Sequence, residues 1–147
     1  MAISASEVKT LLQARFADQL LAQLTNQYQD ANSSDVINDV FLEGAVEDAN
    51  LMFEILAAAD ATISFAEDKM SLIYLTMFFL YLYAQNNPMA DKYLSLAKVF
   101  TLKAFDAHLK SRFPDWNDEK YKQELTIRQY YVQMLPTEPS WYGYQNP

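Results

Sequence analysis

One uninterrupted apolar run constrains the fold of this chain more than any other feature. From Leu72 to Ala84 every residue is aliphatic or aromatic except Thr76. A transmembrane helix needs roughly 20 apolar residues, so this run is too short to span a bilayer. A helix that is hydrophobic on most sides must instead be covered by other protein segments. We therefore predict a central buried helix over Lys69 to Gln85.

The composition of the chain favours helices around that centre. Only two of the 147 residues are glycine, which disfavours sheets because their tight turns need residues that tolerate positive φ. Hydrophobic residues make up 51% of the chain, enough for one core at this length. The predicted fold class is all-α, a small helical bundle over residues 1–112 followed by an extended aromatic C-terminal arm over residues 113–147.

Two short helices are predicted near the N-terminus. Ser4, with Glu7 three residues later, has the form of a capping box at the start of a helix. A second short helical turn is predicted over Asp18 to Leu24. The polar stretch from Thr25 to Ser34 then reads as a loop, because it is rich in Asn, Gln, Asp and Ser.

A longer helix is predicted from Asp35 to about Leu56. Its apolar residues recur at the spacing of one helix face. They are Ile37, Val40, Phe41, Ala45, Ala49, Met52, Phe53 and Leu56. A connection near Ala59 to Phe65 would join this helix to the central one.

The segment after the central helix predicts a helical hairpin. Asn86, Asn87 and Pro88 form a tight turn signal, because proline disfavours the α conformation in the preceding residue. A helix over Ala90 to Leu109 would then lie antiparallel to the central helix, and Pro114 ends it. A further short helix is predicted around Asp118 to Gln133.

Net charge and residue usage exclude several classes of function. The formal charge is -8, with 19 acidic and 11 basic residues, so phosphate backbones and anionic lipids are repelled. The absence of cysteine excludes disulfides and thiolate chemistry. The segment Met1 to Lys9 lacks the charged and apolar regions of a signal peptide. We expect no sequence-specific nucleic acid binding and no membrane association.

Catalytic and metal-binding patterns are also missing. The single histidine, His108, follows Asp106 by two residues, and side chains two apart on a helix do not share a face. A lone histidine near a helix end is usually a surface residue or a favourable charge at the C-terminus. No Gly-rich phosphate loop, Glu-x-x-His motif or calcium loop occurs. We expect no catalytic residues, no cofactor and no bound metal, although an enzyme with a less obvious site is a third, weaker reading.

The charges that are present follow a pattern on the predicted helices. Acidic residues recur along one side of the Asp35 to Leu56 helix, and no Lys or Arg occurs between Asp30 and Asp68. This acidic row comprises Asp35, Asp39, Glu43, Glu47 and Glu54. Lys92, Lys103 and Lys110 share a row on the later helix. Either the acidic row is a solvated surface, or the two rows meet between identical subunits in a contact that closes into a ring.

Aromatic residues mark the C-terminal arm as a second candidate site. Tyrosine and tryptophan are enriched among interface anchors, whereas disordered tails are poor in aromatics. The residues concerned are Tyr130, Tyr131, Trp141, Tyr142 and Tyr144. The arm either folds back over its own bundle or docks on a neighbouring protein.

The order of these segments resembles one known family. Three segments within about Ser4 to Leu109 carry the resemblance, namely EVKTLLQARFADQLLAQLTNQ, DVINDVFLEGAVEDANLMFEILAA and DKYLSLAKVFTLKAFDAHL. Together they resemble the head-tail connector (adaptor) proteins of tailed bacteriophages. The resemblance lies in element order and residue type. It implies a helical bundle that assembles as a ring, usually of twelve copies, between the portal protein and the tail-side neck protein.

The resemblance also implies a location and partners. The protein would be made in the host bacterial cytoplasm and would act in the neck of the virion, with DNA passing through the ring and the arm docked on the portal. The alternative from another class is a free-standing helical binding or regulatory module that recognises a basic partner through the acidic row and the aromatic arm.

Overall fold

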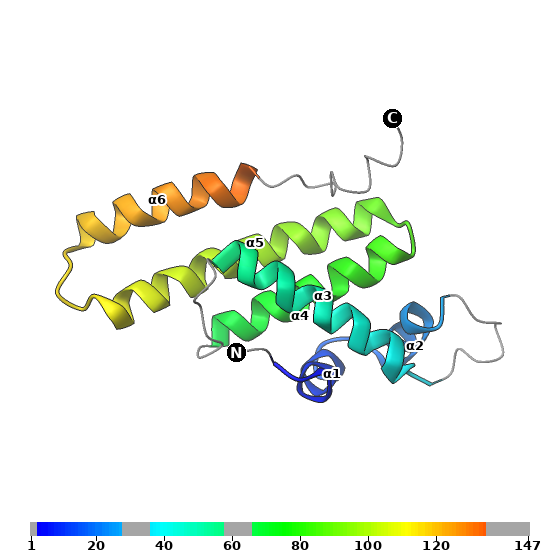
Figure 1. The fold of residues 1–147 in the computed structure, drawn as a ribbon. Helices are drawn as coiled ribbons and strands as arrows, with labels where there is room; N and C mark the ends of the chain where they lie inside the picture. The colour runs from blue at the N-terminus through cyan, green and yellow to red at the C-terminus, as the bar shows by residue number, and fades with distance from the viewer. Residues whose placement is uncertain (1–2, 28–35, 58–65, 135–147) are drawn as a thin grey trace.

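A computed structural model describes residues 3–27, 36–57 and 66–134. Within these residues the chain forms six helices and no strands (Figure 1). The helices are α1 (Ala5–Gln13), α2 (Asp18–Thr25), α3 (Asp39–Ala57), α4 (Ala66–Tyr83), α5 (Asn87–Arg112) and α6 (Asp118–Met134). The predicted all-α bundle is confirmed. The predicted loop near Ala59 to Phe65 lies outside the described residues.

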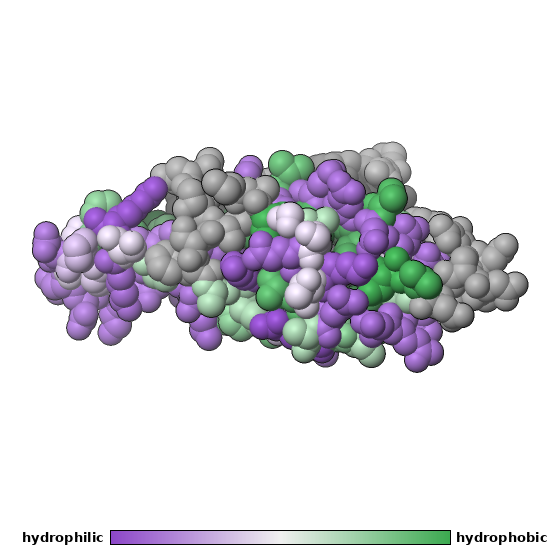
Figure 2. Space-filling view, turned by 90° about the horizontal axis from the view of Figure 1, so that it is seen from below, coloured by the Kyte–Doolittle hydropathy of each residue, from purple (hydrophilic) through white to green (hydrophobic). Residues whose placement is uncertain are grey.

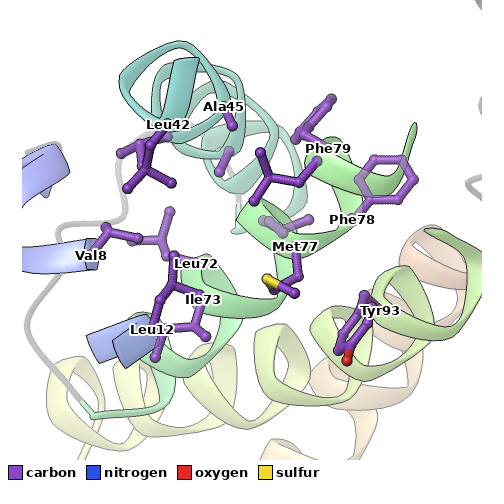
Figure 3. Close-up of a cluster of buried hydrophobic side chains, with 14 of the residues drawn as sticks. Val8, Leu12, Leu42, Ala45, Leu72, Ile73, Met77, Phe78, Phe79 and Tyr93 are labelled. Carbon is purple, nitrogen blue, oxygen red and sulfur yellow. The ribbon is translucent and has the colours of Figure 1, made fainter. Parts of the chain in front are cut away.

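Helix α4 occupies the centre of the bundle, as its apolar sequence predicts. Its residues from Ser71 to Tyr81 are buried except for Tyr74, which is half-buried. Figure 3 shows α4 side chains facing Val8 and Leu12 of α1, Leu42 and Ala45 of α3, and Tyr93 of α5. A helix covered from several directions needs no polar face, which explains why α4 has almost none.

Helices α4 and α5 form an antiparallel hairpin held by small residues and a polar contact. Ser71 and Thr101 are both fully buried, and their hydroxyl oxygens lie 2.6 Å apart. Both hydroxyls also lie within hydrogen-bonding distance of the Ala97 carbonyl, Thr101 at 2.8 Å and Ser71 at 3.4 Å. Small side chains at these positions let the two helices approach closely.

In the turn between α4 and α5, a glutamine takes the backbone conformation that is usually left to glycine. Gln85 has a φ of 58°, the left-handed conformation that usually falls to glycine after a helix. Its amide donates to the Leu82 carbonyl, and the Asn86 amide donates to the Tyr81 carbonyl. Asn86 then caps α5 by accepting a hydrogen bond from the Met89 amide at 3.3 Å. The turn runs from Ala84 to Asn86, so Asn86 belongs to it as predicted, whereas Asn87 and Pro88 already lie in the first turn of α5.

The first and third helices differ in detail from their sequence predictions. Ser4 caps α1 by accepting a hydrogen bond from the Glu7 amide at 3.3 Å, while the Glu7 carboxylate pairs with Lys69 of α4 at 3.1 Å. Helix α3 begins at Asp39, four residues later than predicted. The prediction that Val40 belongs to the core face is wrong, because its side chain is 80% exposed.

Helix α6 confirms the helix predicted around Asp118 to Gln133 and forms a second hairpin with α5. Figure 1 shows the C-terminal half of α5 extending past the rest of the bundle, with α6 running back alongside it. Tyr121 is buried and donates its hydroxyl hydrogen to the Phe113 carbonyl. Phe113 and Trp116 stack with ring centroids 4.2 Å apart, so aromatic contacts hold the hairpin end together.

Candidate interaction surfaces

The outward side of α3 is the most distinctive surface of the described chain. Val40, Glu43, Glu47, Leu51 and Glu54 are all exposed, and their three- and four-residue spacing places them on one side of the helix. We call these five residues the α3 face. Val40 and Leu51 are 80% and 60% exposed, so the surface combines carboxylates with aliphatic side chains. A purely solvated helix side would carry polar residues at these positions.

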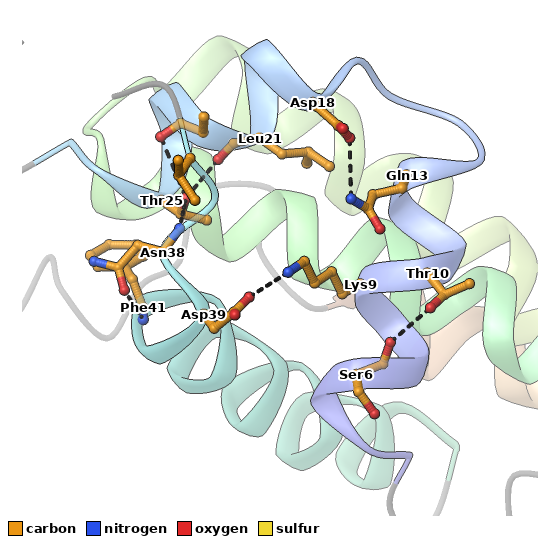
Figure 4. Close-up of polar contacts among 12 residues, drawn as sticks. Ser6, Lys9, Thr10, Gln13, Asp18, Leu21, Thr25, Asn38, Asp39 and Phe41 are labelled. Carbon is orange, nitrogen blue, oxygen red and sulfur yellow. Dashed lines mark hydrogen bonds and ion pairs between the residues drawn. The ribbon is translucent and has the colours of Figure 1, made fainter. Parts of the chain in front are cut away.

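The carboxylates of the α3 face lack partners in the described part of the chain. Glu43, Glu47 and Glu54 take part in no ion pair or hydrogen bond among these residues. Asp39 differs, because it accepts a hydrogen bond from the Lys9 ammonium of α1 at 2.8 Å (Figure 4). Asp39 therefore serves the packing of α1 on α3, and Asp35 lies outside the described residues.

A groove of roughly 570 Å³ lies beside the α3 face. Its lining combines Glu43, Glu47 and Glu54 with Ile3, Val46 and Leu51. One wall is fixed by Asn50, whose side chain exchanges two hydrogen bonds with the Ile3 backbone, each 3.2 Å long. The groove is therefore part of the folded bundle, with apolar atoms and carboxylates together.

Figure 2 shows the side of the molecule on which α1 lies. Hydrophobic surface appears between polar side chains over the middle of this view, whereas the end formed by the α5–α6 turn is mostly hydrophilic. The apolar surface seen here thus lies on the bundle, away from the projecting hairpin end.

The predicted basic row on α5 divides into two parts. Lys92 and Lys103 are exposed and form no ion pair within the described residues. Their ammonium groups lie 5.6 and 5.1 Å from the ring centroids of Tyr93 and Phe100, near enough for weak cation–π attraction. Val99, which is 49% exposed, lies between them. We call Lys92, Val99 and Lys103 the α5 face.

Lys110, the third member of the predicted row, is engaged within its own hairpin. Its ammonium group lies 2.9 Å from the Asp106 carboxylate, and that hydrogen bond raises the pKa of Lys110. Both residues line a hollow of roughly 690 Å³ between α5 and α6. Lys98, also on α5, is partly buried, and desolvation lowers its pKa against the opposing effect of Asp91.

The aromatic residues of the predicted docking arm are only partly described. Tyr130 lies on α6 with 64% of its surface exposed, close in sequence to Ile127 at 52%. Tyr131 is part of the same helix. Trp141, Tyr142 and Tyr144 lie outside the described residues, so the arm's docking role stays a prediction.

The structure gives His108 a role that the sequence analysis missed. Its Nε2 atom lies 3.1 Å from both carboxylate oxygens of Asp68, which is fully buried near the start of α4. His108 is therefore neither a free surface residue nor a partner of Asp106. Forty residues separate the pair, and only the antiparallel packing of α4 and α5 brings them together.

Among the described residues, no group of three or more His, Cys, Asp or Glu side chains is arranged to hold a metal ion. In the same part of the chain, no helix has the length and hydrophobicity needed to cross a membrane. Comparisons with models of known protein families, with curated proteins and with solved structures find no match to this chain.

Proposed function

We propose that this protein is a non-catalytic structural subunit of a bacteriophage neck, a head-tail connector whose copies form a ring between the portal protein and the tail. The observation that carries the assembly part of the proposal is the α3 face. It exposes two large aliphatic side chains beside three carboxylates that have no partner in the described part of the chain. A partner with basic and apolar groups would cover both kinds of side chain on this face.

The specific identification as a connector rests on the resemblance in element order. A short N-terminal helix pair precedes a helix with an acidic side, and a helical hairpin follows it. A ring through which DNA passes would also benefit from a net negative charge, which is -8 here, because DNA is then repelled from its walls.

The test is the mass of the purified chain in solution, alone and with the portal protein encoded by the same genome. Light scattering should give a homo-oligomer, or a monomer that becomes a ring on the portal. A chain that stays monomeric and does not bind the portal would contradict the proposal. If that monomer bound a basic peptide instead, the alternative of a free-standing binding module would be favoured.

A further inference from the structure

The α3 face and the α5 face carry opposite charges at matching intervals. Glu43 and Glu54 are eleven residues apart, and Lys92 and Lys103 are also eleven residues apart. At 1.5 Å per residue, each pair spans about 16 Å along its helix, which is close to three turns. The two carboxylates of one face could therefore lie opposite the two ammonium groups of the other at the same time.

The apolar residues of the two faces fit the same alignment. Leu51 lies three residues before Glu54, and Val99 lies four residues before Lys103. When Glu54 faces Lys103 and Glu43 faces Lys92, these aliphatic side chains come opposite one another. Both are about half exposed or more, at 60% and 49%, so a contact between them would remove apolar surface from water.

Gly44 is exposed beside the α3 face. A Cβ atom added to Gly44 would meet no atom within 4 Å, and glycine within a helix costs about 1 kcal/mol relative to alanine. Contacts within the described part of the chain therefore do not require this glycine. A second helix could approach α3 closely here, because no side chain stands between the two backbones.

We infer that the α3 face of one copy docks on the α5 face of a second copy, with Glu43 and Glu54 paired with Lys92 and Lys103. The inference deepens the proposed function and rests on its assembly part, because it names the surface that covers the α3 face. The two faces belong to different helices of each copy. A contact that uses only one of these faces on each copy is head-to-tail, and it generates a ring when the rotation closes.

Two charge-reversal variants test this pairing. In the first, Glu43→Lys and Glu54→Lys make both faces basic; in the second, Lys92→Glu and Lys103→Glu make both faces acidic. Each variant alone should show self-association weakened about 100-fold or more, because like charges then meet across the contact. An equimolar mixture should regain association, since every contact between the two variants joins opposite charges.

Controls keep the test interpretable. Asp115→Lys with Glu119→Lys makes the same change in net charge as the first variant, at exposed positions in the α5–α6 turn and the first turn of α6, and should leave association unchanged. Circular dichroism should show each variant as helical as the original chain. The pairing is overturned if either reversal variant associates normally, or if the folded mixture stays dissociated. If the original chain associates only on the portal protein, the same variants are compared with the portal present. If it associates neither alone nor on the portal, the proposed function fails, whereas normal association of a reversal variant overturns the pairing alone.

Discussion

At the scale of single residues, the shortage of glycine creates a strain that substitution should relieve. Gln85 follows the end of α4 and has a φ of 58°, where a side chain crowds the following carbonyl. We expect Gln85→Gly to raise the free energy of unfolding by about 0.5–1 kcal/mol, or the melting temperature by about 2–4 °C. Gln85→Ala, which keeps a Cβ atom, should give no such gain in thermal unfolding. An equal gain for both variants would contradict this explanation.

The contact between Asp68 and His108 should contribute to the free energy of unfolding. Asp68 is fully buried and lies 3.1 Å from His108 Nε2. We expect His108→Ala or Asp68→Ala to lower the free energy of unfolding by about 1–3 kcal/mol, because each removes one side of a buried hydrogen bond. Denaturant titration of both single variants and the double variant should reveal coupling of about 0.5 kcal/mol or more. Additive losses would mean that the contact contributes nothing of its own.

At the scale of secondary structure elements, the aliphatic residues of the α3 face should matter for association and little for folding. Val40 and Leu51 are mostly exposed within one subunit, so Val40→Ser with Leu51→Ser should change the free energy of unfolding by less than about 1 kcal/mol. Self-association measured by sedimentation should weaken, because the contact loses apolar burial.

Ile127→Ser provides the matched control for this prediction. Ile127 is also about half exposed, at 52%, but it lies on α6 and belongs to neither proposed face. It should alter neither stability nor association. Equal association by the Val40 and Leu51 double variant and the original chain would show that these side chains are ordinary surface residues.

Elements whose signals are local could be predicted from the sequence. The apolar run from Leu72 to Ala84 predicted a buried central helix, and Asn86 with Pro88 predicted the hairpin turn that follows it. The side of α3 was harder, because Val40 is compatible in spacing with both the core side and the acidic side. The Asp68–His108 contact could not be predicted, since no local spacing relates residues on two packed helices.

At the scale of the whole molecule, the α5–α6 hairpin separates two roles that the sequence analysis assigned to one arm. Tyr121 and Val132 of α6 are buried, so this part of the arm belongs to the packed structure. Tyr130 and Ile127 point away from it with much of their surface exposed. A docking contact made by the arm would therefore use the outer side of α6 and the residues beyond Met134.

The last prediction separates docking from folding at the C-terminus. Each large aromatic side chain buries about 150–250 Å² when fully covered, so Trp141, Tyr142 and Tyr144 seated in a partner would stabilise a complex substantially. Deleting Pro136 to Pro147 should leave helix content and the cooperative melting transition unchanged, because α1 to α6 precede the cut. Binding to the portal protein should be lost. A truncated chain that melts without cooperativity would instead show that these residues complete the core, and the docking role would then be wrong.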